Sequence, residues 1–330
     1  MSRAQLTSTV EQNTGGVISP YVAGKNFIAN GNFDWWQRGT TFSSPTAYTA
    51  DRWYSTTVGT VTFSQETSVV PNGSTYAMKW TTGAGSSYGS ILQAFEDKDV
   101  NLMAGNTITL SALVRAQASF SGNATMYIET NTTANTMTGG TWTQVASLNY
   151  APSTSAYGKM QLSYAVPAGT KGIRVNLVLG SAQASGTGLY WSQVQLELGP
   201  VATPFSRAGG TLSGELAACE RYYERTTPGV AYGRYCDVQY NNSATQVVGG
   251  IQFKTTKRVI PTSVDYANIR VQENGIGAVG TVNSFGINVE ATTKLGQVSI
   301  GLTSGAAAGK AYALMNDNNV AGYIGFSAEL

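Results

Sequence analysis

From residue 25 onward the chain consists of short segments in which apolar and polar residues alternate. In the segment 76–80, for example, Tyr76, Met78 and Trp80 share one face. Alternation over six to ten residues, bounded by clusters of Gly, Asn, Ser and Pro, predicts β-strands. The strands predicted in the first part of the chain cover 26–37, 60–66, 76–80, 90–95, 107–116, 124–130, 159–166, 171–179 and 188–198. Strands at this spacing predict an antiparallel jelly-roll β-sandwich over residues 25–208, the first unit.

One segment after residue 208 has helical periodicity instead. Its apolar residues recur at i, i+4, i+7 and i+11: Leu212, Leu216, Cys219 and Tyr223. Ser213 is a candidate cap, and the helix is expected to end at Tyr223 or Glu224. Alternating strand patterns then resume over 230–240, 246–254, 263–272, 282–290, 295–302, 310–315 and 322–330. Residues 209–330, the second unit, are therefore predicted to form a short helix and a smaller antiparallel β-sandwich.

Residues 1–24 are polar, with only scattered apolar side chains. Such a segment buries too little apolar surface to fold alone. It is either a floppy tail or a docking peptide that orders on a larger partner. It lacks the apolar centre of a signal peptide, and no apolar run in the chain approaches the length of a membrane span, so we expect no membrane insertion.

Charged residues make up 12% of the 330 residues, about half of the usual ~25%, and Gly, Ser, Thr and Asn are abundant in their place. The net charge of +2 provides no basic face for nucleic acid. Histidine is absent, which excludes Ser-His-Asp and Cys-His catalytic groups and removes the commonest metal ligand. We therefore expect no cofactor, no catalytic residue and no metal centre.

The chain has two cysteines, Cys219 and Cys236. Two are too few for a disulfide scaffold or a four-thiolate zinc site. Because nothing in the sequence marks secretion, we expect two free buried thiols, with a disulfide between them as the alternative.

Glycoside hydrolysis needs only two carboxylates, so the absence of histidine does not exclude it. The carboxylates of the first unit are Asp34, Asp51, Glu66, Glu96, Asp97, Asp99, Glu129 and Glu197. No spacing among them requires that two face each other across a cleft. The chain is therefore expected not to be an enzyme, and a polysaccharide depolymerase with two carboxylates is the alternative of another class.

All six tryptophans lie in the first unit, where flat rings can either fill the core or stack on sugar rings. Four lie beside other apolar residues at an inward-facing phase and are expected in the core: Trp35, Trp53, Trp80 and Trp191. Trp142 follows the loop 136–140, and Tyr88 follows a Gly-Ser-Ser turn. These two side chains are the candidates for contact with a glycan.

Charged residues are rare inside the apolar-rich segments near the start of the first unit, so each needs a partner. Asp34 and Arg38 are close in sequence, as are Asp51 and Arg52. A semi-buried guanidinium requires paired acceptors. The simplest interpretation is an Asp–Arg network that holds the first strand to its neighbour, with Glu197 on the last strand as a further partner.

Three segments in this order resemble a large group of bacteriophage tail-fibre and other virion-attached fibre proteins. They are NFIANGNFDWWQRG at 26–39 with YTADRW at 48–53, VQLELG at 194–199 with ATPF at 202–205, and ELAACERYY at 215–223. The resemblance covers about residues 25–225. It implies that the first unit is similar to carbohydrate-binding jelly rolls, some of which hold a structural calcium. Asp51, Gln193 and Glu197 could serve that role, but no dense cluster of oxygen ligands appears.

The resemblance implies a non-enzymatic structural fibre of a tailed phage, assembled in the host cytoplasm and located on the virion. Residues 1–24 would attach it to a tail, baseplate or capsid protein, and the β-units would bind a host-surface glycan. A capsid fibre or decoration protein is the alternative location. The predicted helix has apolar side chains on more than one face. Leu216, Cys219, Tyr222 and Tyr223 are thus candidates for a homotrimer contact, unless the helix is wedged between the two units of one chain.

Overall fold

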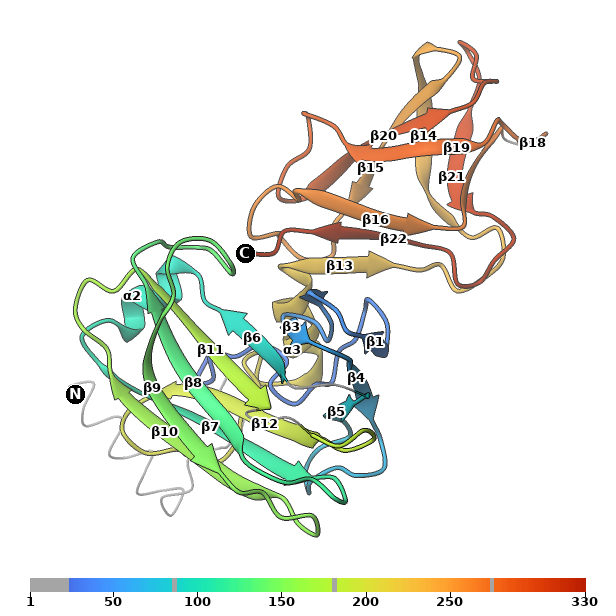
Figure 1. Ribbon diagram of the computed structural model, residues 1–330. Coiled ribbons are helices and arrows are strands. Elements are labelled where there is room, and N and C mark those ends of the chain that lie inside the picture. The colour runs from blue at the N-terminus through green and yellow to red at the C-terminus, as the bar shows by residue number, and fades with distance from the viewer. Residues whose placement is uncertain (1–23, 85–87, 180–182, 274–275) are drawn as a thin grey trace, which may run out of the picture.

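The computed structural model describes residues 24–84, 88–179, 183–273 and 276–330, and this part of the chain is almost entirely antiparallel β-structure (Figure 1). The expected anchor, residues 1–24, lies outside the described residues except for Gly24. None of the described helices is long and apolar enough to cross a membrane.

The first unit consists of two six-stranded sheets. Sheet A contains, in spatial order, β1 (Thr41–Ser43), β4 (Val61–Glu66), β5 (Ala77–Thr82), β12 (Leu189–Leu198), β7 (Thr107–Ala116) and β10 (Gly158–Ala165). Sheet B contains β2 (Ala47–Tyr48), β3 (Tyr54–Val58), β6 (Tyr88–Ala94), β11 (Gly172–Leu179), β8 (Ala124–Asn131) and β9 (Thr143–Tyr150). The short helix α2 (Asp97–Met103) follows β6.

The second unit begins with helix α3 (Leu212–Glu220) and contains two further sheets. Sheet C has the order β13 (Tyr223–Thr226), β22 (Tyr323–Ser327) and β16 (Ser263–Ala267). Sheet D has the order β18 (Gly277–Ala278), β17 (Ile269–Glu273), β21 (Tyr312–Asn316), β14 (Arg234–Ser243), β15 (Gln246–Gln252), β20 (Leu295–Leu302) and β19 (Val282–Ile287). The predicted fold class is therefore confirmed: an all-β jelly-roll sandwich, a short helix and a second, smaller sandwich.

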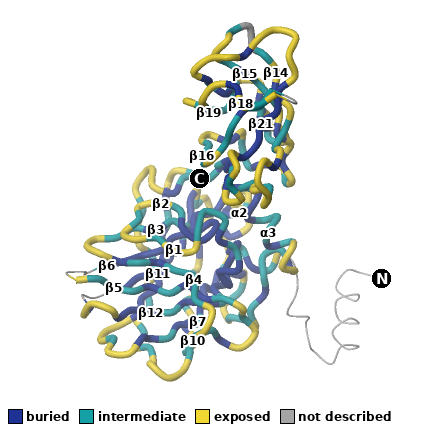
Figure 2. The backbone as a smooth tube through the Cα atoms, turned by 90° about the vertical axis from the view of Figure 1, so that its right-hand side faces the viewer, coloured by how far each residue is buried: buried dark blue, intermediate teal, exposed yellow. Residues whose placement is uncertain are grey.

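Buried apolar residues form one large cluster in each unit, and Figure 2 colours the buried residues dark blue. Trp53, Trp80 and Trp191 are fully buried in the first, as the alternation predicts. Trp35 was expected there too, but it is half-buried, and its neighbour Trp36 is the ring that packs inside. The inward and outward positions of Trp35 and Trp36 are the reverse of those expected, because the segment 26–37 forms a series of turns and not the predicted strand.

Side chains hold these turns in place of a strand ladder. Asn30 has a φ of 58°, and its amide donates to the carbonyls of Trp35 and Asp51 and accepts from the Trp35 amide. The Gly31 carbonyl accepts from Val194 N, and a Cβ at Gly31 would overlap the Val194 carbonyl. Asn at the left-handed position and Gly at the close approach are therefore both required.

Helix α3 is shorter than expected, and its cap differs. Thr211, not Ser213, is the N-cap, and its hydroxyl accepts from Gly214 N. The helix ends at Glu220, so Tyr222 lies in the turn after it and Tyr223 begins β13. The polypeptide thus passes from helix to strand while both tyrosines remain buried.

The predicted Asp–Arg pairs do not form. Arg38 and Arg52 both contact the carboxylate of Glu329, near the end of the second unit, whose side chain is 5% exposed. The Arg52 guanidinium also stacks on the Tyr222 ring and that of Arg38 on the Tyr223 ring, each at 3.5 Å. These five residues, the junction cluster, join the two units. The expected network within the first unit is therefore wrong, and the arginines connect the first unit to the second.

The acidic partners in that predicted network have other roles. Asp34 pairs with Arg207 at 2.8 Å, and Glu197 accepts from Thr203 and lies 3.8 Å from the Lys25 ammonium group. Asp51 is fully buried and accepts from the backbone and side-chain amides of Gln37. Burial raises the pKa of Asp51 to about 6, although the bonds from Gln37 act in the opposite direction.

A second contact between the units involves the turn after α3. Glu96, just before α2, accepts two hydrogen bonds of 2.9 Å from the Arg221 guanidinium and one from the Tyr222 hydroxyl. Burial acts to raise the pKa of Glu96, but the hydrogen bonds from Arg221 and Tyr222 outweigh it and lower the pKa to about 2. Glu96 therefore remains ionised and fastens the turn after α3 to the first unit.

The E329Q substitution should lower the free energy of unfolding by about 3 kcal/mol, because it leaves the buried Arg52 charge without a carboxylate. The measurement is denaturant unfolding followed by tryptophan fluorescence. The control is D237N, which breaks the exposed Arg234–Asp237 pair and should change stability by less than about 1 kcal/mol. Equal, small effects of the two substitutions would contradict a stabilising role of the junction cluster.

Asp51 should make stability depend on pH. Because its pKa in the folded chain lies above the ordinary value of 3.8, the folded state binds more protons than the unfolded state between about pH 4 and about pH 6. Its contribution to stability is therefore largest below about pH 4 and is lost as the pH rises through 6. Relative to D51N, the wild type should lose about 3 kcal/mol between about pH 4 and about pH 7. Parallel pH profiles of the two proteins would show this assignment to be wrong.

Candidate functional site

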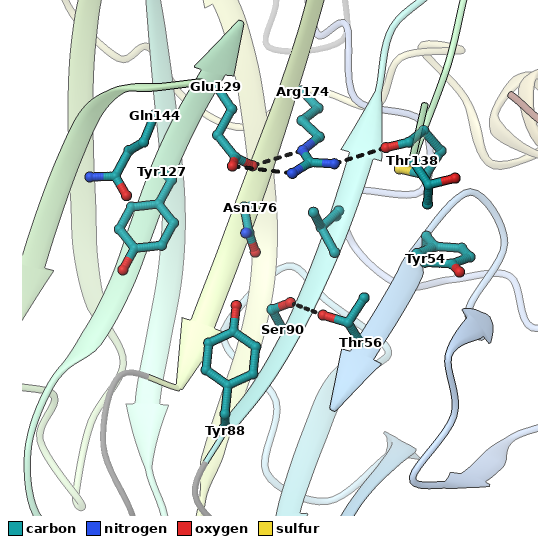
Figure 3. Close-up of a pocket in the computed structure, with 12 residues that line it drawn as sticks. Tyr54, Thr56, Tyr88, Ser90, Tyr127, Glu129, Thr138, Gln144, Arg174 and Asn176 are labelled. Carbon is teal, nitrogen blue, oxygen red and sulfur yellow. Dashed lines mark hydrogen bonds and ion pairs between the residues drawn. The ribbon is translucent and has the colours of Figure 1, made fainter. Parts of the chain in front are cut away.

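The outer face of sheet B carries a groove with a volume of about 230 Å³ (Figure 3). Its lining consists of Tyr54, Thr56, Tyr88, Ser90, Leu92, Tyr127, Glu129, Met137, Thr138, Gln144, Arg174 and Asn176. Successive residues of a strand face opposite sides, so every second residue of these strands points away from the core. The same alternation that fills the core therefore places a polar and aromatic set outside.

Strand register sets the arrangement of these side chains. Asn176 of β11 pairs with Leu92 of β6 and with Tyr127 of β8, and Leu92 pairs with Tyr54 of β3. In the next row, Arg174 pairs with Glu129, and Glu129 pairs with Gln144 of β9. Residues from five strands, far apart in sequence, therefore form two adjacent rows across the groove.

Three phenol rings, those of Tyr54, Tyr88 and Tyr127, line the groove and are only half-buried. Burial raises the pKa of Tyr127, and the neighbouring Tyr88 and Glu129 act in the same direction. The Tyr127 hydroxyl therefore remains protonated at neutral pH and can donate a hydrogen bond. Each ring also offers an apolar face to a ligand.

Arg174 and Glu129 form a two-bond ion pair, with Nε donating at 2.8 Å and Nη2 at 3.2 Å (Figure 3). Nη1 of Arg174 donates to the Met137 carbonyl at 2.8 Å. The ring of Trp142 stacks on the guanidinium group at 4.3 Å. Arg174 is thus held on several sides, and its charge is compensated within the groove.

Asn176 lies on the floor of the groove and is 5% exposed. Its Oδ1 atom has no hydrogen-bond partner among the described residues. Figure 3 shows Tyr127 beside it and Tyr88 further along the sheet, with the Tyr88 hydroxyl pointing toward it. On the other side of the groove, the Ser90 and Thr56 hydroxyls form a hydrogen bond of 2.7 Å. The groove therefore contains a buried acceptor that the protein itself does not use.

The second unit reaches this face of sheet B. Leu92, Ala94 and Met137 form a small buried apolar cluster, and Leu330 and Tyr54 pack against it. Tyr54 belongs to the groove, and Leu330 directly follows Glu329 of the junction cluster. Leu330 therefore packs next to one end of the groove, although all of the described lining residues belong to the first unit.

Of the two predicted glycan contacts, Tyr88 lines the groove and Trp142 does not. Trp142 is half-buried and supports Arg174 instead. The other lining residues were not predicted. The available signal was the appearance of Tyr127, Glu129, Arg174 and Asn176 at outward-facing positions of otherwise apolar strands, but strand order is needed to bring them together.

Of the predicted homotrimer contacts, Cys219, Tyr222 and Tyr223 are buried by contacts within one chain, and Leu216 is half-buried. The turn after α3 is bound to the first unit through Glu96, while β13 pairs with β22 of the second unit. This corresponds to the alternative expectation, a helix wedged between the two units.

The described residues contain no group of three His, Cys, Asp or Glu side chains that could hold a metal ion. Asp51 and Glu197, considered for calcium, are bonded to different neighbours, and the Gln193 amide donates to Asn72 and Ser74. Cys219 and Cys236 are both free thiols. Burial raises the pKa of Cys236 to about 12, with Asp237 adding to the effect.

No protein-family model matches the chain, and no curated protein matches it. Solved structures with similar folds include tailspike protein 4 of bacteriophage CBA120, in its enzymatically active domain, at 17% identity and a TM-score of 0.38 over 55% of this chain and 22% of that one. The chain thus spans less than a quarter of that tailspike domain.

Similar solved structures also include the xylan-binding CBM22-1 domain of Paenibacillus barcinonensis Xyn10C, at 13% identity and a TM-score of 0.35 over 55% of this chain and 98% of the domain. The C-terminal family 22 carbohydrate-binding module of Clostridium thermocellum Xyn10B matches at 12% identity and a TM-score of 0.34, over 53% of this chain and 99% of that one.

Proposed function

We propose that this chain is a non-enzymatic fibre protein of a tailed bacteriophage that binds a glycan of the host surface in the groove of sheet B. The observation that carries the binding function is the groove itself. Half-buried phenol rings of Tyr54, Tyr88 and Tyr127 stand around amide, hydroxyl and guanidinium groups on a rigid sheet.

This combination suits sugars because a pyranose ring has an apolar face of C–H groups and an edge of hydroxyls. Tyrosine rings provide flat apolar area for the face. Asn176, Gln144 and the groove hydroxyls provide hydrogen-bond partners for the edge. A concave site with a few placed polar groups is also the usual form of a small-molecule site.

The composition of the groove favours binding over catalysis. Glu129 is the only carboxylate among the described residues that line it, and Arg174 engages both of its oxygens. Hydrolysis by the usual glycosidase mechanisms needs two carboxylates, one on each side of the bond that is cleaved. A depolymerase, the alternative of another class, would need its acid and base at another place on the chain.

Attachment to the virion is proposed from the three sequence segments that resemble phage fibres, with residues 1–24 as the anchor to a tail, baseplate or capsid protein. A homotrimer would multiply a weak, shallow contact by making the later binding events intramolecular. Its interface would have to use surface other than Cys219, Tyr222 and Tyr223, because these side chains are already buried within one chain. A capsid fibre remains the alternative location.

The substitutions Y88A and Y127A should each weaken glycan binding by roughly tenfold. This corresponds to a loss of about 1.4 kcal/mol of binding free energy, because each substitution removes one ring contact. Binding is measured first on an array of bacterial oligosaccharides and then by calorimetry. The control is Y190A, which removes a half-buried tyrosine from sheet A and should leave the affinity unchanged. Failure of the wild type to bind any glycan would refute the binding function, and release of new reducing ends at catalytic rates would favour the depolymerase.

Antibodies against the chain should label tails or capsids of purified phage particles in negative stain, because the proposed fibre is a virion component. Light scattering after size exclusion should give three times the chain mass of 34.7 kDa. Phage particles that bind no antibody would contradict the assignment to a virion fibre. A mass equal to that of one chain would contradict the homotrimer.

A further inference from the structure

We infer that the groove selects an uncharged, hydroxyl-rich stretch of polysaccharide and that Asn176 is the residue that recognises it. This inference rests on the proposed glycan binding and adds the class of ligand. Two independent features of the groove support it: the balance of its charges and the unused acceptor on its floor.

The groove offers no free positive charge to an acidic sugar. Arg174 is the only cationic side chain among the described lining residues, and three of its N–H groups are already engaged by Glu129 and the Met137 carbonyl. A uronate or phosphate group would therefore lose its hydration without gaining an unpaired cation, and it would lie near the Glu129 carboxylate. Lys171 is exposed but lines a separate hollow at the ends of β8 and β9.

The floor of the groove requires a donor from the ligand. Asn176 is 5% exposed, and its Oδ1 atom has no partner among the described residues. A buried acceptor without a partner is unfavourable, so a ligand that supplies an O–H group gains more there than at an exposed site. A sugar hydroxyl is such a donor, whereas an ionised carboxylate or phosphate has only acceptor oxygens and would be repelled.

Aromatic residues near Asn176 favour a ligand whose hydroxyl belongs to a sugar ring. Tyr127 is the cross-strand partner of Asn176, and Figure 3 shows Tyr88 further along the sheet, with its hydroxyl pointing toward Asn176. A sugar unit placed over Asn176 therefore lies beside the Tyr127 ring, which can contact its C–H face, and near the Tyr88 hydroxyl. Leu92, the cross-strand partner on β6, adds apolar surface beside this position.

The test compares one polysaccharide in two forms, a native uronate-containing polymer and its carboxyl-reduced product, each titrated into the full chain by calorimetry. The reduced, neutral form should bind at least about tenfold more tightly, and its affinity should change little between low salt and about 0.5 M NaCl. Tighter binding of the acidic form, or a steep loss of affinity with salt, would overturn this inference while leaving glycan binding intact. Binding of neither this pair nor any array glycan would count against the proposed function itself.

Variants at residue 176 test the recognising atom. N176A should weaken binding of the neutral polymer by roughly tenfold without lowering the free energy of unfolding, because it removes an unpartnered acceptor. N176D keeps an acceptor oxygen and should bind the neutral polymer within about threefold of the wild type while rejecting the acidic form further. The matched control is N149A, an exposed asparagine of β9 outside the groove lining. Unchanged binding by N176A, or equal losses in N176A and N149A, would refute the role of Asn176.

Discussion

The carboxylate of Glu329, buried between the guanidinium groups of Arg38 and Arg52, joins the end of the second unit to the first. Removing one member would leave a buried charge without its partner, which is far more costly than the loss of an exposed pair. Arg52 also donates to the Ala94 carbonyl at the end of β6, and Leu330 and Tyr54 both pack against the small apolar cluster that includes Ala94. The second unit therefore contacts the sheet next to the groove, although every described lining residue belongs to the first unit.

Within the groove, the buried charges are also paired, but here the pairing leaves no free charge for a ligand among the described lining residues. Arg174 and Glu129 neutralise each other, and Trp142 covers the guanidinium group. What remains available to a ligand is aromatic surface, hydroxyls and the Asn176 amide, whose buried oxygen has no partner among the described residues. Such a surface discriminates through shape and hydrogen bonding, with little contribution from long-range electrostatics. This agrees with the low charged fraction of the sequence as a whole.

Several sequence-based predictions failed where contacts are non-local. The segment 26–37 has apolar residues in alternation, but Asn30 and Gly31 direct the backbone into turns, so Trp36 rather than Trp35 enters the core. Asp34 and Asp51 are the acidic residues nearest in sequence to the two arginines, yet the partner of both is Glu329, 277 residues from Arg52. Of the two predicted glycan contacts, Tyr88 lines the groove, whereas the Trp142 ring packs against the Arg174 guanidinium. Proximity in sequence did not predict these ion pairs, because a semi-buried guanidinium can pair with any carboxylate that lies close to it in the folded chain.

By itself the sequence determined the fold class, the buried tryptophans Trp53, Trp80 and Trp191, and the existence of one helix after residue 208. These features follow from local periodicity, since the alternation of a strand and the repeat of a helix are set by a few neighbouring residues. Only the tertiary structure decided which strands are neighbours, and hence that Tyr54, Tyr127, Arg174 and Asn176 share one groove and that Glu329 meets Arg52. Sheet order is a global property: each strand's outward face is encoded locally, but its neighbours are chosen by the packing of the whole core.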